Sequence, residues 1–268
     1  HLKVKRSPEN QIFLDYVRFL NTKKKDGEAV KARMDATRDP IAKARDKEQL
    51  VALDKEIKDY MNAAVQKAPT TYAASLIRMS IEPDQVEIKT AEGKVDSSAT
   101  YYHYRQHYWD NTDLTDERIL RAPVFQNKFD EYIGKVVPQI PDTINKLADD
   151  LISRMSSTPE LFKFAVHNIT YKYETSEIMG MDAVFVHMAQ SYYCPKGNEP
   201  SKATWMSKDK LDKLCERARK QAPIVIGAKA KNIILTDTTE QRWIDMYKMP
   251  SEYVLVVFWD PHCGHCKK

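Results

Sequence analysis

Apolar side chains recur at three- and four-residue steps through most of this chain, and this spacing constrains its fold more than any other feature. One such stripe consists of Ile12, Phe13, Tyr16, Val17 and Leu20. The spacing is typical of an amphipathic helix, and similar patterns continue to about residue 220. Glycine is scarce, with 7 residues in 268, whereas doubly wound and barrel folds use more glycine in their turns. We therefore expect a mainly α protein.

The first quarter of the chain predicts a charged helical hairpin. Lys23–Gly27 has the composition of a loop, and the charged segment 28–67 follows it. Within that segment, a short heptad-like seam is formed by Leu50, Leu53, Ile57, Tyr60 and Ala64. The seam lasts only about two heptads, which favours an antiparallel hairpin over an extended coiled coil. We expect Pro40 to break the segment near its middle.

Residues 82–98 read as a loop, and helical patterns resume after it. The predicted helices span residues 101–109, 125–137, 143–155, 161–173, 181–193 and 208–220. Prolines separate them at regular intervals, as is common at helix starts. There is no convincing repeat of fixed length, so a solenoid is only a minor alternative.

The helical spacing of apolar residues ends near residue 221, and strand-like runs follow. Residues 232–236 read as a strand, and residues 253–259 form a continuous β-branched and aromatic run. A run that is apolar on both faces fits a strand in the middle of a sheet with helices on both sides. We therefore expect two parts: an all-helical domain over residues 1–220 and the opening strands of an α/β domain over residues 221–268.

The motif that carries chemistry is Cys263-Gly264-His265-Cys266. A buried strand, a short turn and Cys-x-x-Cys form the arrangement of a thioredoxin-like redox site. If a helix begins at the motif, its N-terminus favours the thiolate of Cys263, the attacking group. Cys266 then lies one turn on, where it can resolve a mixed disulfide, and His265 can stabilise the first thiolate. The tetrapeptide matches the active-site sequence of protein disulfide isomerases.

Other uses of the same cysteines fit less well. A structural zinc site needs four ligands, and the chain has no second Cys-x-x-Cys. A c-type haem site needs histidine after the second cysteine, where this chain has Lys267. Peroxiredoxins use a lone peroxidatic cysteine at this turn. We expect disulfide exchange, with no metal and no cofactor.

Beyond the motif, the chain resembles TlpA/ResA-like thioredoxin-family proteins of Bacteroidetes that carry an N-terminal helical domain of unknown function. The resemblance rests on residues 222–232 for the redox domain, and on residues 125–132, 136–144, 178–182, 192–193 and 205 for the helical one. It implies a location in the periplasm or cell envelope. Family members often have an aromatic residue before the first cysteine, where this chain has His262.

The chain begins at His1 without a leader and ends two residues after the motif. We expect it to be a piece of a longer protein. A complete thioredoxin-like domain needs roughly 70–100 further residues. The 268 residues alone are therefore expected to be inactive as an oxidoreductase.

Several other reactive or aromatic residues have a structural interpretation. Cys194 and Cys215 are expected to be packed free thiols, with a structural disulfide as the less favoured alternative. His167 and His187 lie in apolar helices and are expected to be hydrogen-bonded core residues. The aromatic segment Tyr101–Trp109 is expected to pack in the core; stacking on nucleobases or gripping a peptide is the alternative.

Charge and hydropathy limit the partners. The net charge is +4, and both signs are interleaved, so we expect no nucleic acid. No run approaches the roughly 18 apolar residues of a membrane span. The expected partners are protein thiols and disulfides together with an unidentified redox partner. In the competing interpretation, the helical domain is a non-catalytic binding scaffold or a homodimer platform in an envelope protein.

Overall fold

Prolines open most of the long helices in the computed structural model of this chain, which describes residues 4–84, 86–260, 262 and 264. A proline at the first helical position removes an N–H that would have no partner there. The helices that begin in this way are α1 (Pro8–Ala36), α2 (Pro40–Lys67), α5 (Pro123–Glu131), α6 (Pro141–Arg154) and α7 (Pro159–Glu174).

The remaining elements are shorter. The other α-helices are α3 (Tyr72–Met79), α4 (Ser97–His107), α8 (Asp182–Met188) and α9 (Lys208–Gln221). Single π-helical turns, Tyr132–Val136 and Ala189–Tyr193, extend α5 and α8. Short 3₁₀ turns lie at Glu117–Arg121, Ala222–Ile224 and Met246–Lys248, and the strands are β1 (Ile234–Thr236) and β2 (Trp243–Asp245). The mainly α prediction is confirmed, and the helices predicted from residue 101 onward are present; α3 has no counterpart among the predicted elements.

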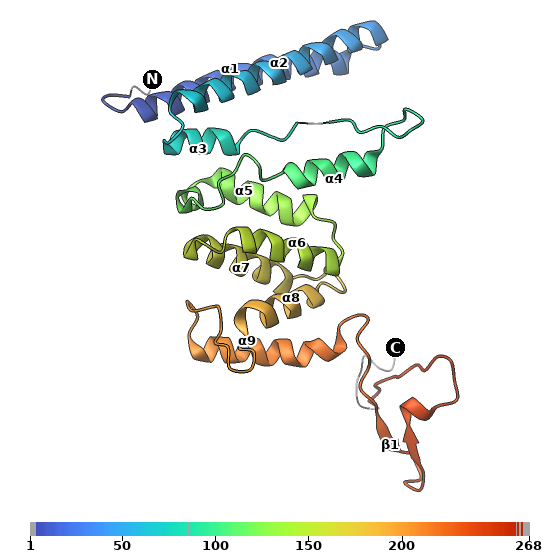
Figure 1. Cartoon of the computed structure of the whole chain (residues 1–268). Helices are drawn as coiled ribbons and strands as arrows, with labels where there is room; N and C mark the ends of the chain where they lie inside the picture. Colours follow the sequence, from blue (N-terminus) through green and yellow to red (C-terminus); the bar gives the residue numbers. More distant parts are fainter. Residues whose placement is uncertain (1–3, 85, 261, 263, 265–268) are drawn as a thin grey trace.

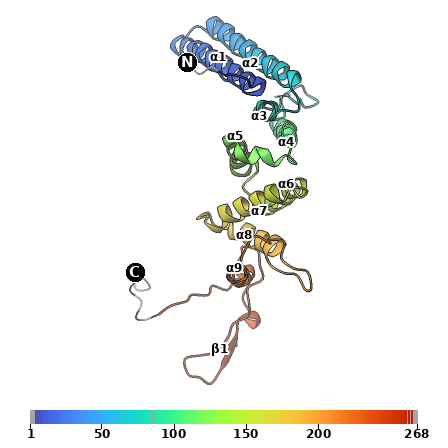
Figure 2. The same ribbon diagram turned by 90° about the vertical axis from the view of Figure 1, so that its left-hand side faces the viewer.

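The helices form an elongated stack in which most helix–helix contacts join helices one or two elements apart in the sequence (Figure 1). The α1–α2 hairpin lies at one end and α9 at the other, as the view in Figure 2 also shows. Stacking of this kind is typical of helical repeat proteins, although the sequence shows no repeat of fixed length. The stack places the hairpin far from the segment that follows α9.

The predicted break at Pro40 is confirmed, because α1 ends at Ala36 and α2 begins at Pro40. The predicted loop at Lys23–Gly27 is wrong: α1 runs through it without interruption. Its side chains face solvent or the partner helix, and the Lys23 ammonium lies 2.7 Å from the Glu56 carboxylate of α2. Docking of α1 on α2 therefore outweighs the cost of about 1 kcal/mol for glycine inside a helix. The hairpin is antiparallel, as expected, but starts at Pro8.

Two hydrophobic clusters meet on α3. The smaller one joins the hairpin to α3 and consists of Tyr16, Met61, Ala64, Ile77 and Ile81. The larger one runs from Met79 through α5–α8 to Ala218 of α9. Ile77 and Met79 lie close together on α3 yet belong to different clusters. This short helix therefore connects the hairpin to the rest of the stack, α4–α9, which we call the body.

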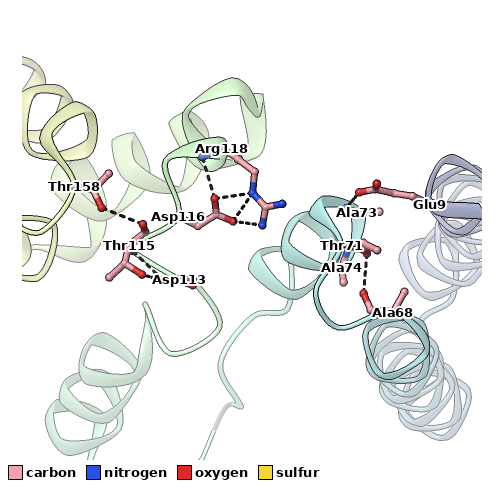
Figure 3. A network of polar contacts seen from close by, with 10 residues as sticks. All are labelled: Glu9, Ala68, Thr71, Ala73, Ala74, Asp113, Thr115, Asp116, Arg118 and Thr158. Atoms are coloured by element: carbon pink, nitrogen blue, oxygen red, sulfur yellow. Dashed lines mark hydrogen bonds and ion pairs between the residues drawn. The ribbon is translucent and has the colours of Figure 1, made fainter. Parts of the chain in front are cut away.

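Polar contacts reinforce the same junction (Figure 3). The backbone N–H of Ala73, at the start of α3, donates to a carboxylate oxygen of Glu9 on α1 at 2.9 Å. The guanidinium of Arg118 pairs with Asp116 at 2.7 Å and lies 5.7 Å from the ring centroid of Tyr72. On the other side, the Thr158 hydroxyl donates to the Thr115 carbonyl. Uncapped N–H groups at a helix start favour such a carboxylate.

The C-terminal part holds a single small sheet among the described residues. β1 pairs with β2 in antiparallel register, with Leu235 opposite Ile244, which confirms the strand predicted at residues 232–236. The strand predicted at residues 253–259 is wrong. This segment is not part of the described sheet, and Tyr253, Leu255 and Phe258 are 84%, 89% and 86% exposed. A β-prone run forms a strand only where a neighbour takes up its backbone groups, and the described sheet contains only β1 and β2.

Candidate functional site

The predicted exchange residues Cys263, His265 and Cys266 lie outside the described residues, so their geometry is not part of the structure. Just before them, the backbone N–H of His262 donates to the Asp260 carboxylate at 2.7 Å. Such an Asp-led contact two residues on is typical of a tight turn. The Asp260–His262 contact therefore lies directly before the motif, whose own arrangement stays a prediction.

An apolar groove lies upstream of that turn. Its lining comes from the β1–β2 hairpin and the segment after it: Ile233, Leu235, Thr236, Ile244, Met246, Met249, Val254, Leu255, Val256 and Val257. Asn232 braces the hairpin, because its side-chain amide donates to Asp245 at 2.8 Å. Exposed apolar side chains gathered in this way mark a surface that gains free energy when covered.

Cys194 and Cys215 form a disulfide, with their Cα atoms 5.5 Å apart. The expectation of two free thiols is wrong. The π-helical turn Ala189–Tyr193 ends with the Cys194 N–H donating to the Ala189 carbonyl, which turns Cys194 toward α9. Cys215, on the apolar stripe of α9, is 8% exposed. A disulfide is typical of an oxidising compartment. Cys215 is buried and Cys194 partly buried against the core, which differs from an exposed exchange site.

A second polar cluster joins three elements of the body. Nε2 of His187 on α8 lies 2.9 and 3.0 Å from the two carboxylate oxygens of Asp149 on α6. The hydroxyl of Tyr192, in the π-helical turn, donates to Asp149 at 2.7 Å. Burial, followed by the bond to the Asp149 carboxylate, raises the pKa of Tyr192, so the phenol stays protonated and keeps donating. The cluster is a structural clamp, and His187 is hydrogen-bonded as expected.

The aromatic segment 101–109 is buried only at its end, just past α4, which itself has no buried residue. Tyr108 and Trp109 are 1% and 2% exposed, which confirms core packing for these two rings. Burial and the carboxylate of Glu82 raise the pKa of Tyr104 to about 12. Tyr102 stays on the surface, 52% exposed, with the Arg105 guanidinium 4.8 Å from its ring centroid.

Lys128 of α5 is a buried cation beneath the same segment. Its side chain is 5% exposed, and its ammonium lies 4.4 Å from the ring centroid of Tyr108. Burial lowers the pKa of Lys128, opposed by the carboxylates of Glu82 and Glu131. The lysine ties α5 to α4 by a cation–π contact of a kind worth about 2 kcal/mol when desolvated.

His167 lines a different surface. Its ring stacks on Tyr171 at 6.3 Å between centroids. It borders a shallow cleft together with Leu120, Glu160, Lys163, Phe164, Asn168 and Trp205. It is thus at the body's surface rather than in the deep core that the sequence suggests.

Sequence reasoning missed a polar cleft between α2, α4 and the loop that follows α3. Its lining includes Lys58, Glu82, Asp84, His103, His107 and Asp110. The one signal for it was the spacing of two histidines, one helical turn apart on α4. Within residues 4–84, 86–260, 262 and 264, no three His, Cys, Asp or Glu side chains are already gathered for a metal ion.

No described helix is both long and apolar enough to cross a membrane. Comparison with known families matches residues 64–221 to the model of a domain of unknown function, DUF5106. The match therefore begins near the end of α2 and ends with α9. No curated protein and no solved structure matches the chain.

Proposed function

The chain belongs to the DUF5106 family, and we propose that the complete protein performs thiol–disulfide exchange on protein substrates through Cys263 and Cys266. The observation that carries the proposal is the tetrapeptide Cys263-Gly264-His265-Cys266 directly after an apolar segment and a turn. Paired cysteines at this spacing can close a disulfide by themselves, which a lone reactive cysteine cannot.

The proposed reaction has two steps. The Cys263 thiolate attacks one sulfur of a substrate disulfide, forms a mixed disulfide and releases the other substrate sulfur as a thiolate. The Cys266 thiolate then attacks the Cys263 sulfur, closes the Cys263–Cys266 disulfide and releases the second substrate thiolate. Two electrons pass from the cysteine pair to the substrate; the reverse sequence oxidises a substrate dithiol. His265 favours the Cys263 thiolate and so makes the disulfide easier to reduce.

Within this proposal, residues 221–268 are the opening part of a TlpA/ResA-like redox domain, and residues 1–220 are the platform that holds substrate or partner nearby. Holding a substrate next to a slow exchange site raises its effective concentration. The Cys194–Cys215 disulfide supports an oxidising compartment such as the periplasm or envelope. The apolar groove between β1, β2 and residues 254–257 supports a covered, protein-bound state of this segment.

A second candidate is a non-catalytic scaffold, and the stacked helices favour it. Elongated stacks present long surfaces to partners, or to a second copy of the same chain. In that case the body binds its partner with no covalent step, and Cys263 has no role in complex formation.

A trapping experiment separates the two candidates. In the complete protein, which supplies the rest of the expected redox domain, Cys266→Ser removes the resolving thiol, so exchange should accumulate a mixed disulfide between Cys263 and a disulfide-containing test protein. The matched control is Cys263→Ser, which should trap nothing. Equal, reductant-resistant complex formation by both variants would instead support the scaffold.

A further inference from the structure

The polar cleft beside α4 contains a pair of histidines with the spacing of a metal chelate. His103 and His107 lie one helical turn apart on α4, and both line the cleft. Their ring centroids are 4.3 Å apart, with 41° between the ring planes. Side chains four residues apart on a helix share one face, so both imidazoles can reach a single ion in the cleft.

A carboxylate orients one member of the pair. Nδ1 of His107 lies 2.6 Å from Oδ2 of Asp110. In the neutral ring, Nδ1–H donates to this carboxylate, and Nε2 keeps the lone pair that a metal requires. Metal-binding histidines commonly carry such a carboxylate on the other ring nitrogen, where it fixes the tautomer and raises ligand basicity.

The cleft also supplies oxygen ligands. The Tyr104 hydroxyl donates to Glu82 at 3.1 Å, which holds that carboxylate beside the α4 turn of His103. Asp84 borders the cleft too, although Lys58 lies 3.3 Å from its carboxylate. The Lys58 ammonium would repel a bound cation, but it is paired with two carboxylates, Asp84 at 3.3 Å and Asp54 at 3.5 Å. Among the described residues, Glu82 borders the cleft without a lysine ion pair but is not gathered with the two histidines, so its side chain would have to move to become a third ligand.

We propose that His103 and His107 form a binding site for a divalent transition-metal ion, with Zn²⁺ as the reference ion. Imidazole nitrogen suits Zn²⁺, Ni²⁺ and Cu²⁺, whereas Mg²⁺ and Ca²⁺ prefer sites built from oxygen alone. Glu82 or water completes the coordination shell. The site is independent of the proposed exchange reaction.

Zinc titration of the full chain tests the site, provided that the thiols are removed first, because Cys263 and Cys266 would themselves bind Zn²⁺. In a Cys263→Ser/Cys266→Ser background, we expect one Zn²⁺ per chain. His103→Ala or His107→Ala should lower the affinity at least about tenfold. The matched control is His167→Ala on α7, which should leave it unchanged. Equal affinity in the His107→Ala variant would overturn the proposal, because the ion would then be elsewhere.

Two further measurements separate binding from folding. Asp110→Ala should weaken Zn²⁺ binding about 10- to 100-fold, and Asp110→Asn should restore most of it, because an amide oxygen still accepts from Nδ1–H. In the background chain with its histidines intact, Zn²⁺ should slow modification of His103 and His107 by diethyl pyrocarbonate, but not of His167. Unchanged modification of the α4 pair at saturating Zn²⁺ would overturn the proposal even if a variant failed to fold.

Discussion

Cys194 and Cys215 join the end of the π-helical turn after α8 to the middle of α9. The bond matters because α9 is highly charged and offers only a narrow apolar stripe, formed by Leu211, Leu214, Cys215 and Ala218. An ion pair between Arg217 and Glu174 at 2.7 Å adds a second anchor. The disulfide therefore holds the last helix of the stack against the body.

Removing this disulfide should destabilise the protein. A cross-link that closes a loop of this size, with a sequence separation of 21 residues, contributes roughly 3 kcal/mol by restricting the unfolded chain. The double variant Cys194→Ser/Cys215→Ser should lose about that much free energy of unfolding in urea. Adding reductant should lower the midpoint of the unmodified chain in the same way. Coincident unfolding curves with and without reductant would show that the bond contributes nothing.

Replacing Asp149 with alanine should destabilise the fold more than replacing its exposed neighbour Asp150. Asp149→Ala leaves the hydroxyl of Tyr192, which is 8% exposed, without its acceptor, and an unsatisfied buried group costs about 1–3 kcal/mol. The matched control is Asp150→Ala, because Asp150 is exposed on the same helix. Thermal unfolding should show a clear loss for the first variant and almost none for the second. Equal losses would mean that the clamp does not hold α6 to α8.

Alkaline pH should destabilise the fold through its buried tyrosines. Burial raises the pKa of Tyr104, Tyr173 and Tyr193 to about 12, against about 10 in the unfolded chain. Between these values the unfolded chain binds fewer protons than the folded one, so stability falls as pH rises. The stability that these protonated tyrosines contribute should be fully present below about pH 10 and lost as the pH rises toward about 12. Absorbance titration of the phenolates checks this, and Tyr104→Phe should remove one late-titrating group. Ionisation of all tyrosines near pH 10 would contradict it.

Helices were predictable from this sequence because each carries its own periodic stripe and often its own proline. The Cys194–Cys215 pairing could not be predicted from the sequence. A π-helical turn after α8 brings the two cysteines together, and this turn leaves no mark in the spacing of the apolar residues. The Asp149–His187 contact likewise spans 38 residues and depends on how α6 packs on α8.

The errors at Lys23–Gly27 and residues 253–259 have a common cause. Local composition favoured a loop in the first segment and a strand in the second. In each case the neighbouring element decided the outcome: α2 packs against α1 and supports a continuous helix, whereas the described sheet consists of β1 and β2 and does not include residues 253–259. The exchange motif itself was visible in the sequence alone, because its chemistry depends on four consecutive residues.

Reactivity of the motif should depend on the order of its cysteines. Cys263 is the proposed attacking thiolate, so it should react with iodoacetamide at a lower pH than Cys266 in the reduced chain. His265→Ala should shift the Cys263 profile toward higher pH, because the ring no longer stabilises the thiolate. Peptide-level mass spectrometry separates the two cysteines. Identical profiles for both cysteines would argue against an activated nucleophile.

The reduction potential of the Cys263–Cys266 pair tests the central claim most directly. The complete protein would be equilibrated with glutathione buffers of known potential, and its free thiols alkylated and mapped, so that Cys194 and Cys215 are followed separately. The disulfide-isomerase-like tetrapeptide predicts a potential near about −180 mV. A value below about −270 mV, the potential of thioredoxin, would contradict the account, because the pair would then lack the more oxidising potential that its disulfide-isomerase-like tetrapeptide predicts.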